Sequence, residues 1–321
     1  MTAKGPPLSW IWGGPAERLA WRRYWIRDLL SGMNTLVWHH LLKLGSVDST
    51  SYMGAVLGVV AAPRYRFRAT RARANLLKLR PDLAPLQDKA MLRVWDNIGR
   101  VLAEFSVIER IWDSASSRVG ITGFEHVEAA RAAGRPRIFV GVHLGNWELL
   151  GPKLIDLGEN VVEFYEPPPN RFRRAVTEYS RRRYAARLLP PGTASALKAI
   201  RQVKEAAASL VILVDETRHR RVQAPSLGRE ISLAGNLGNA VRLAAKTGAL
   251  LLPAYVLREK GARFRVHVLP PIQASATGDA KADMRADAER LDAILGQAVL
   301  DNLEQWVVLP VLKLDGVTSG S

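Results

Sequence analysis

The chain has 321 residues, of which 48% are hydrophobic, so it is long enough to bury a sizeable core. It carries 46 Lys and Arg against 30 Asp and Glu, a formal net charge of +16, which favours anionic partners such as phospholipid surfaces, phosphorylated lipids, acidic carrier proteins or nucleic acid. The absence of cysteine excludes disulfides, thiol nucleophiles and cysteine-ligated metals, and it fits a reducing compartment.

The pattern of residues 1–62 predicts an N-terminal arm followed by amphipathic helices that associate with a membrane. Gly and Pro predict an irregular arm over residues 1–16, without the charged-then-apolar order of a signal peptide. Residues 17–44 carry an apolar stripe flanked by Trp and basic side chains, and residues 52–62 form a second apolar run. Neither reaches the roughly 18 residues of a bilayer-spanning helix. The first pattern suits a helix in the membrane interface, but it also suits an ordinary helix packed on the core.

Residues 63–321 predict a single α/β domain with a helical part at 63–113 and a sheet-containing core at 120–310. Strands are expected at 138–142, 161–165, 210–215, 250–257 and 264–269. Helices are expected at 64–80, 86–112, 126–133, 170–186, 197–208, 236–247 and 281–306. The alternation predicts a mixed, partly parallel sheet flanked by helices, with the N-terminal helices as an extension.

A histidine marks the point where the first of these strands gives way to a helix. His143 follows the apolar run, Gly145 and Asn146 open the next amphipathic segment, and Glu148 lies five residues after the histidine. Residues five apart in one helix are about 140° apart, so the two side chains meet only if His143 precedes the helix. Glu148 would then orient the imidazole and stabilise its protonated form, which makes His143 a general base. A turn histidine beside a surface glutamate is the alternative interpretation.

The segment His143-Leu-Gly-Asn-Trp-Glu148 resembles the His-x-x-x-x-Asp/Glu motif of the bacterial lipid A biosynthesis acyltransferases. These are the lauroyl and myristoyl "late" acyltransferases of the wider glycerolipid acyltransferase superfamily. The resemblance continues in order over residues 65–310. It includes Asn170 followed by a helix that ends in Arg-x-Arg, a strand that ends in Asp215, and a small-residue helix followed by a strand that leads to Arg258.

Three features depart from the family pattern. Glu216 follows Asp215 where the family often has Gln, and the C-terminal Trp-x-x-x-His-Arg-Arg-Trp pattern is reduced to Trp306. The usual hydrophobic N-terminal anchor is weak. These departures bear on the acceptor and on the membrane anchor more than on the chemistry.

The resemblance implies transfer of an acyl group from a thioester to a hydroxyl, with catalytic residues His143 and Glu148 and without a metal or cofactor. The residues that it implies for substrate binding are Asn146, Asn170, Arg181, Arg183, Asp215 and Arg258. Backbone amides of residues 144–146 are expected to face the oxyanion of the tetrahedral intermediate.

The resemblance also implies the partners and the place of action. The donor is expected to be a thioester of acyl carrier protein or of coenzyme A. The acceptor is expected to be an anionic lipid, either a lipid A precursor or related glycolipid, or another membrane lipid such as a phosphatidylinositol mannoside. The protein is expected at the cytoplasmic face of the bacterial inner membrane, as a peripheral or monotopic protein.

Other functional classes fit the sequence less well. The run from Gly141 to Gly145 has the outline of a nucleophile elbow, but His143 stands where a hydrolase has its serine. The chain has no Gly-rich P-loop and no zinc-binding His-x-x-x-His helix. A basic nucleic-acid-binding protein is the non-enzyme alternative, because of the net charge. No signature of a nucleic-acid-binding fold accompanies that charge, so no nucleic acid partner is expected.

Overall fold

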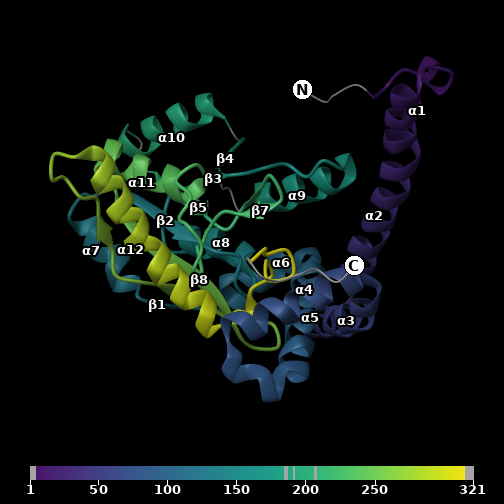
Figure 1. The fold of residues 1–321 in the computed structure, drawn as a ribbon, viewed down its shortest axis with the longest axis horizontal. Helices are drawn as coiled ribbons and strands as arrows, with labels where there is room; N and C mark the ends of the chain where they lie inside the picture. Colours follow the sequence, from purple (N-terminus) through teal and green to yellow (C-terminus); the bar gives the residue numbers. More distant parts are fainter. Residues whose placement is uncertain (1–4, 184–186, 191, 206–207, 315–321) are drawn as a thin grey trace.

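The computed structural model describes residues 5–183, 187–190, 192–205 and 208–314, and it has a helical N-terminal part followed by an α/β body (Figure 1). The helices of the described residues are α1 (Pro15–Arg22), α2 (Asp28–Leu44), α3 (Val47–Ala61), α4 (Arg66–Leu79), α5 (Gln87–Glu104), α6 (Ile108–Trp112), α7 (Phe124–Ala132), α8 (Leu150–Asp156), α9 (Arg171–Arg183), α10 (Thr193–Glu205), α11 (Asn236–Thr247) and α12 (Ala280–Asp301). The strands are β1 (Val119–Thr122), β2 (Arg137–Gly141), β3 (Val161–Phe164), β4 (Arg187–Leu189), β5 (Ser209–Leu213), β6 (Thr217–Arg218), β7 (Arg221–Val222), β8 (Leu250–Lys260), β9 (Arg263–Val268) and β10 (Ile272–Gln273).

One eight-stranded sheet forms the centre of the body. Its order is β1-β9-β8-β2-β5-β3-β4, with β10 paired to β8, and a separate hairpin joins β6 and β7. The strands β8, β2, β5, β3 and β4 run parallel, whereas β9 and β10 are antiparallel to β8. The structure therefore confirms the predicted α/β class with a mixed, partly parallel sheet and an N-terminal helical extension.

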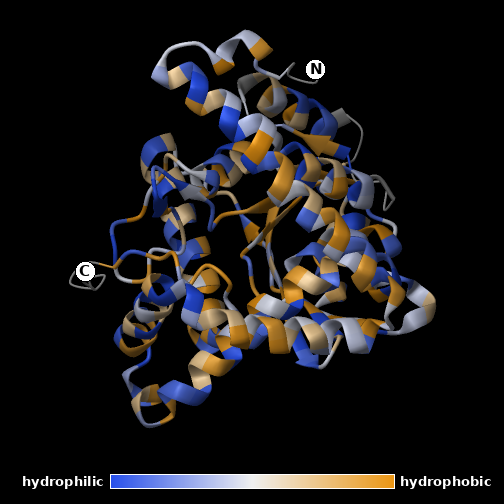
Figure 2. Ribbon diagram, turned by 90° about the vertical axis from the view of Figure 1, so that its right-hand side faces the viewer, coloured by the Kyte–Doolittle hydropathy of each residue, from blue (hydrophilic) through white to orange (hydrophobic). Residues whose placement is uncertain are grey.

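Helices cover both faces of this sheet, which is why its central strands are continuous apolar runs. Along β2, the side chains of Ile138 and Val140 pack into one core cluster and that of Phe139 packs into the other. The helices α10, α11 and α12 contribute to the first cluster, and α7 and α8 contribute to the second. Figure 2 shows the apolar residues gathered on the strands and on the helix sides that face them.

Helices α1 and α2 form a long projection, and glycines allow two especially close contacts between the N-terminal helices and the rest of the protein. The helices α1 and α2 continue one another through residues 23–27 and leave the body together (Figure 1). Gly32 of α2 leaves room for Phe172 of α9, because a Cβ atom there would lie 2.1 Å from the ring. Helix α3 packs on α5 backbone to backbone, since a Cβ on Gly99 would lie 2.1 Å from the carbonyl oxygen of Gly54.

Among the described residues, no helix is both long enough and apolar enough to cross a bilayer. Exposed apolar side chains instead line the outer sides of α2 and α3, and we call this surface the apolar stripe. Its members are Leu30, Met33, Val37, Leu41 and Leu44 on α2 and Met53, Val56, Leu57 and Val60 on α3.

The structure departs from the predicted elements mainly at their ends. The last helix was expected to run to Trp306, but α12 ends at Asp301 and Trp306 lies in a buried turn after it. Periodicity indicated none of the short strands β1, β4, β6, β7 and β10. Strands of two to four residues are too short to show an alternating pattern.

Candidate active site

The parallel sheet brings His143 and Asp215 together at its carboxyl edge. Gly141 of β2 pairs with Leu213 of β5, and the histidine and the aspartate each lie two residues beyond that pair. Because neighbouring strands are about 4.8 Å apart, the two side chains emerge next to each other.

Asp215 holds His143 through the backbone and the side chain. Asp215 Oδ1 is 2.6 Å from the Nδ1 atom of His143, and Oδ2 accepts hydrogen bonds from the His143 amide and from Trp306 Nε1, both at 2.8 Å. Asp215 is only 1% exposed, so its carboxylate serves these three groups rather than solvent.

The structure thus differs from the prediction that Glu148 orients the imidazole. The chain does not enter a regular helix at Gly145. It makes a turn in which Gly145 is left-handed, with φ 52°, and a short 3-10 helix then begins at Trp147. Glu148 is carried away from Nδ1, and the neighbouring strand supplies the carboxylate that binds there.

This arrangement fixes the tautomer of the imidazole. A carboxylate accepts a hydrogen bond from Nδ1–H, so in neutral His143 the proton lies on Nδ1 and the lone pair lies on Nε2. Burial opposes the protonated form of His143, but the carboxylates of Asp215 and Glu148 outweigh it and raise the pKa of the histidine above its ordinary value. The side chain is 25% exposed, so the ring is reachable from one side. The arrangement suits a general base.

Glu148 binds Arg181, the arginine expected from the Arg-x-Arg pattern. One guanidinium nitrogen of Arg181 lies 2.7 and 2.8 Å from the two carboxylate oxygens of Glu148. The guanidinium also lies over the ring of Tyr165, 4.8 Å from its centre. Trp147 packs edge-on against the imidazole of His143, with 4.7 Å between the ring centres. Trp147 and the ion pair line the same small cavity, and both Glu148 and Arg181 act electrostatically on His143.

A small cavity lies between this ion pair and the sheet. Its volume is about 50 Å³, and its lining residues include Trp147, Glu148, Glu163, Arg181 and Leu213. Burial raises the pKa of Glu163 to about 7, against the opposing effect of Arg181. The cavity therefore places a second carboxyl group, one that titrates near neutral pH, beside the Glu148–Arg181 pair.

Three predicted substrate-binding side chains are bound within the protein instead. Asn170 accepts hydrogen bonds from the amides of Phe172 and Arg173, and its amide nitrogen donates to the carbonyl oxygen of Asp28. It therefore caps α9 and ties that helix to α2. Asn146 and Arg258 both bind Glu104, a buried residue that sequence reasoning did not single out. The side chain of Arg183 lies outside the described part of the structure.

The backbone amides expected to face the oxyanion are also largely in use. The amide of Leu144 donates to the carbonyl oxygen of Val142 at 2.8 Å, and that of Gly145 donates to the carbonyl oxygen of Gln305 at 3.1 Å. Within the described residues, no group of three or more His, Asp or Glu side chains is arranged to hold a metal ion.

Sequence reasoning missed the contribution of Trp306 to this site. The indole is fully buried and fixes the second oxygen of Asp215. The only signal was the position of Trp306 as the first residue of a reduced family pattern, which gave no indication of its hydrogen-bond partner.

The family model for bacterial lipid A biosynthesis acyltransferase matches residues 18–312. No curated protein matches the chain. One solved structure that it resembles is the 1-acyl-sn-glycerophosphate (LPA) acyltransferase PlsC from Thermotoga maritima, at 14% identity and a TM-score of 0.37, over 81% of this chain and 97% of that chain. That likeness is too distant to support an argument. The family match spans most of the chain, and the protein therefore belongs to the bacterial lipid A biosynthesis acyltransferase family and is an acyltransferase.

Proposed function

We propose that the protein transfers a fatty acyl chain from a thioester to a hydroxyl of a lipid A precursor or a related glycolipid, with His143 as the general base. The observation that carries this proposal is the 2.6 Å contact between His143 Nδ1 and buried Asp215 at the carboxyl edge of the sheet. It directs Nε2 outward with its lone pair available.

The proposed reaction is a direct transfer. Nε2 of His143 takes the proton from the acceptor hydroxyl, and the oxygen attacks the thioester carbonyl. The tetrahedral intermediate collapses, the carbon–sulfur bond breaks, and the protonated imidazole returns its proton to the leaving thiolate. Asp215 stabilises the imidazolium throughout, as the acid of a catalytic triad does. The acceptor oxygen is itself the nucleophile, so an acyl-enzyme has no part in the scheme.

We assign Arg181 to the acceptor. A guanidinium group matches the oxygen atoms of a phosphate well. Glu148 fixes this one by an ion pair, and Arg181 lies close enough to His143 to act on its pKa. A phosphorylated glycolipid would be held with its hydroxyl towards Nε2. A phosphatidylinositol mannoside remains the alternative acceptor, because it also carries a phosphate.

The donor and the location belong to the same proposal. A net charge of +16 suits the acidic surface of an acyl carrier protein and the phosphates of coenzyme A. The apolar stripe on α2 and α3 suits a bilayer surface, and the basic residues of α4 and α9 would add to the attraction if they share that side. We place the protein at the cytoplasmic face of the bacterial inner membrane, as a peripheral or monotopic protein.

The test is to mix the purified protein with acyl carrier protein or coenzyme A thioesters of several chain lengths and a tetraacylated lipid A precursor, and to weigh the products. We expect an acylated lipid with the wild type and a loss of about 10²- to 10⁴-fold with His143→Ala. His40→Ala, at an exposed position on α2, is the control and should keep the rate. Undiminished transfer by His143→Ala would rule out the mechanism.

A further inference from the structure

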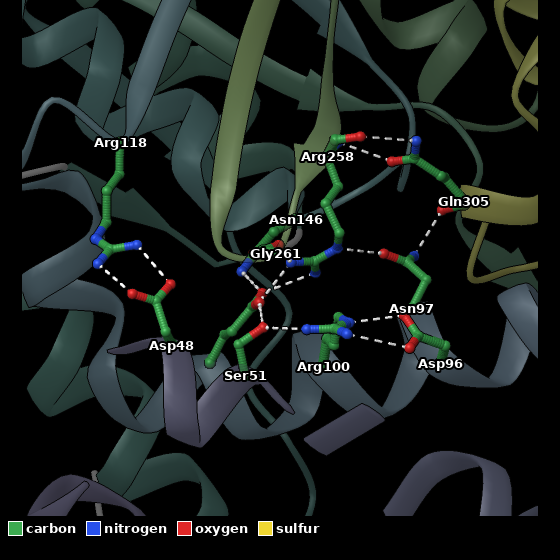
Figure 3. Close-up of polar contacts among 11 residues, drawn as sticks. Asp48, Ser51, Asp96, Asn97, Arg100, Arg118, Asn146, Arg258, Gly261 and Gln305 are labelled. Carbon is green, nitrogen blue, oxygen red and sulfur yellow. Dashed lines mark hydrogen bonds and ion pairs between the residues drawn. The ribbon is translucent and has the colours of Figure 1, made fainter. Parts of the chain in front are cut away.

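Glu104, at the end of α5, is a buried carboxylate that the reaction scheme does not use. Its side chain is fully buried. Its oxygens accept hydrogen bonds from Ser51 of α3 at 2.6 Å, from Asn146 at 3.0 Å and from Arg258 of β8 at 2.9 Å. Figure 3 shows these three partners, Ser51, Asn146 and Arg258, whose polar groups point toward one another.

This cluster is built as a satisfied buried ion pair. A carboxylate away from water is costly unless it is paired and hydrogen-bonded. Arg258 meets Glu104 through both terminal nitrogens and also donates to the side-chain oxygen of Asn97 and the carbonyl oxygen of Gly261 (Figure 3). Removal of Glu104 or Arg258 would leave the other charge buried and unpaired.

The cluster holds the turn that carries His143 at two successive residues. Glu104 binds the side chain of Asn146, and the amide of Gly145 donates to the carbonyl oxygen of Gln305. The side chain of Gln305 in turn binds the backbone amide and carbonyl of Arg258. The backbone of Gly145 also approaches β8 closely, because a Cβ atom there would lie 2.5 Å from the carbonyl oxygen of Val256.

We propose that Glu104 is a positioning residue for acyl transfer: it fixes Asn146, and through Asn146 it sets where His143 stands relative to Asp215 and the substrate. The inference rests on the proposed role of His143 as the base. Through Ser51, the same carboxylate ties the catalytic turn to α3, whose outer side carries part of the apolar stripe. A displacement of about 1 Å of a catalytic group costs about 10²-fold in rate, so a loosened turn should be visible in kcat.

Glu159 supplies a matched control at the amino-terminal ends of the strands, opposite the ends that carry the site. Glu159 is also fully buried and also binds arginine and serine side chains, those of Arg131, Arg137 and Ser209. Arg137 and Ser209 begin β2 and β5, whereas His143 and Asp215 follow the ends of these strands. Glu104→Gln and Glu159→Gln therefore make the same chemical change in similar surroundings, one beside the catalytic turn and one far from it.

The experiment compares the two variants at equal folded fraction, judged by circular dichroism, in the transfer assay described above. We expect Glu104→Gln to lower kcat by about 10- to 100-fold with little change in KM for the donor, and Glu159→Gln to keep the wild-type kcat. Equal losses in the two variants would overturn the proposal, because they would mean general destabilisation.

Two further readouts test whether Glu104 acts through Asn146. Asn146→Ala should lower kcat as Glu104→Gln does, and the double variant should lose no more than the worse single variant. Losses that multiply would overturn the proposal. In proton NMR, the Nδ1–H of His143 should give a downfield resonance that is absent from His143→Gln. The chemical shift of this resonance should change in Glu104→Gln and stay the same in Glu159→Gln.

The outcomes separate this inference from the proposed function. Full activity of His143→Ala would remove the general-base scheme whatever Glu104 does. An inactive His143→Ala together with a fully active Glu104→Gln would leave the scheme intact and refute the positioning role. If Glu104→Gln fails to fold, Asn146→Ala still breaks the same contact from the side of the turn and leaves the Glu104–Arg258 pair in place.

Discussion

At the scale of single residues, Asp215 fixes the position, the tautomer and the proton affinity of His143. In Asp215→Asn, the amide group can present an N–H to Nδ1 in place of an acceptor, which favours the wrong tautomer. We expect kcat to fall by about 10²- to 10⁴-fold. Asp287→Asn is the control, because Asp287 is also buried and binds Ser275 and Arg290, away from the site. Wild-type kcat in Asp215→Asn would contradict this role.

The pH dependence of the reaction follows from the same contacts. Asp215 and Glu148 raise the pKa of His143 against the effect of burial, and only neutral His143 can take a proton. Transfer should therefore fall as the pH drops through that raised pKa, so the acidic limb should lie above the value of about 6.5 for an ordinary histidine. Glu148→Gln removes one of the raising carboxylates and should move the limb to lower pH in a kcat/KM profile. An unmoved limb would show that Glu148 does not act on His143 electrostatically.

At the scale of elements, helix α2 depends on a buried histidine. His39 Nδ1 lies 3.1 Å from Ser106 Oγ, and burial, aided by Lys43 and His40, lowers the pKa of His39 to about 4. The folded protein thus binds fewer protons than the unfolded chain between about pH 6.5 and 4. The contribution of His39 to stability is present above pH 6.5 and declines by up to about 1.4 kcal/mol per unit as the pH falls to 4.

This loss should appear first in α2 itself. We expect amide hydrogen exchange over residues 28–44 to accelerate between pH 6.5 and 5, after correction for the intrinsic pH dependence of exchange. His39→Gln should flatten the dependence, and His219→Gln, at an exposed position outside α2, should not. Protection that is independent of pH in the wild type would refute the linkage.

Sequence patterns gave the elements of this fold better than they gave the contacts between them. Helix α11 has the bounds expected from its apolar periodicity, because that signal is local. The partner of His143 was misassigned to nearby Glu148, since Asp215 lies 72 residues away along the chain. Parallel pairing brings such distant positions together, and no spacing rule records it. Glu104 was missed for the same reason, because its partners come from α3, β8 and the catalytic turn.

At the scale of the whole molecule, the apolar stripe and the basic helices determine how the protein meets a surface. We expect it to float with anionic liposomes and to lose this binding at high salt, because each basic residue near the surface adds about 1 kcal/mol and salt screens it. Deletion of residues 1–62 would also remove α3 from α5, so substitution is the cleaner test. A variant with Met33, Val37 and Leu41 changed to Gln should float poorly.

The control for this test is Leu197→Gln on α10, which makes the same kind of change at one exposed apolar position outside the stripe. Leu197 is 63% exposed, and α10 lies on the opposite side of the body from α2 (Figure 1). It should leave flotation unchanged. Equal flotation of the triple variant and the wild type would rule out the stripe on α2 as the membrane contact, and retention of the wild type after alkaline carbonate washing would indicate an integral mode of attachment.

Because the turn around Trp306 lies near the end of the chain, the active site is completed late in synthesis. His143 leaves the ribosome early, but its carbonyl binds the amide of Val307, and Asp215 needs the indole of Trp306. A growing chain therefore contains His143 and Asp215 before the contacts of residues 306 and 307 that align them can form, so we expect no acyl transfer until these residues have left the ribosome. Chains arrested on the ribosome with a spacer after residue 302 should be silent in the transfer assay, and those arrested after residue 314 should be active. Activity in the shorter chains would show that acyl transfer does not require the contacts made by Trp306 and Val307.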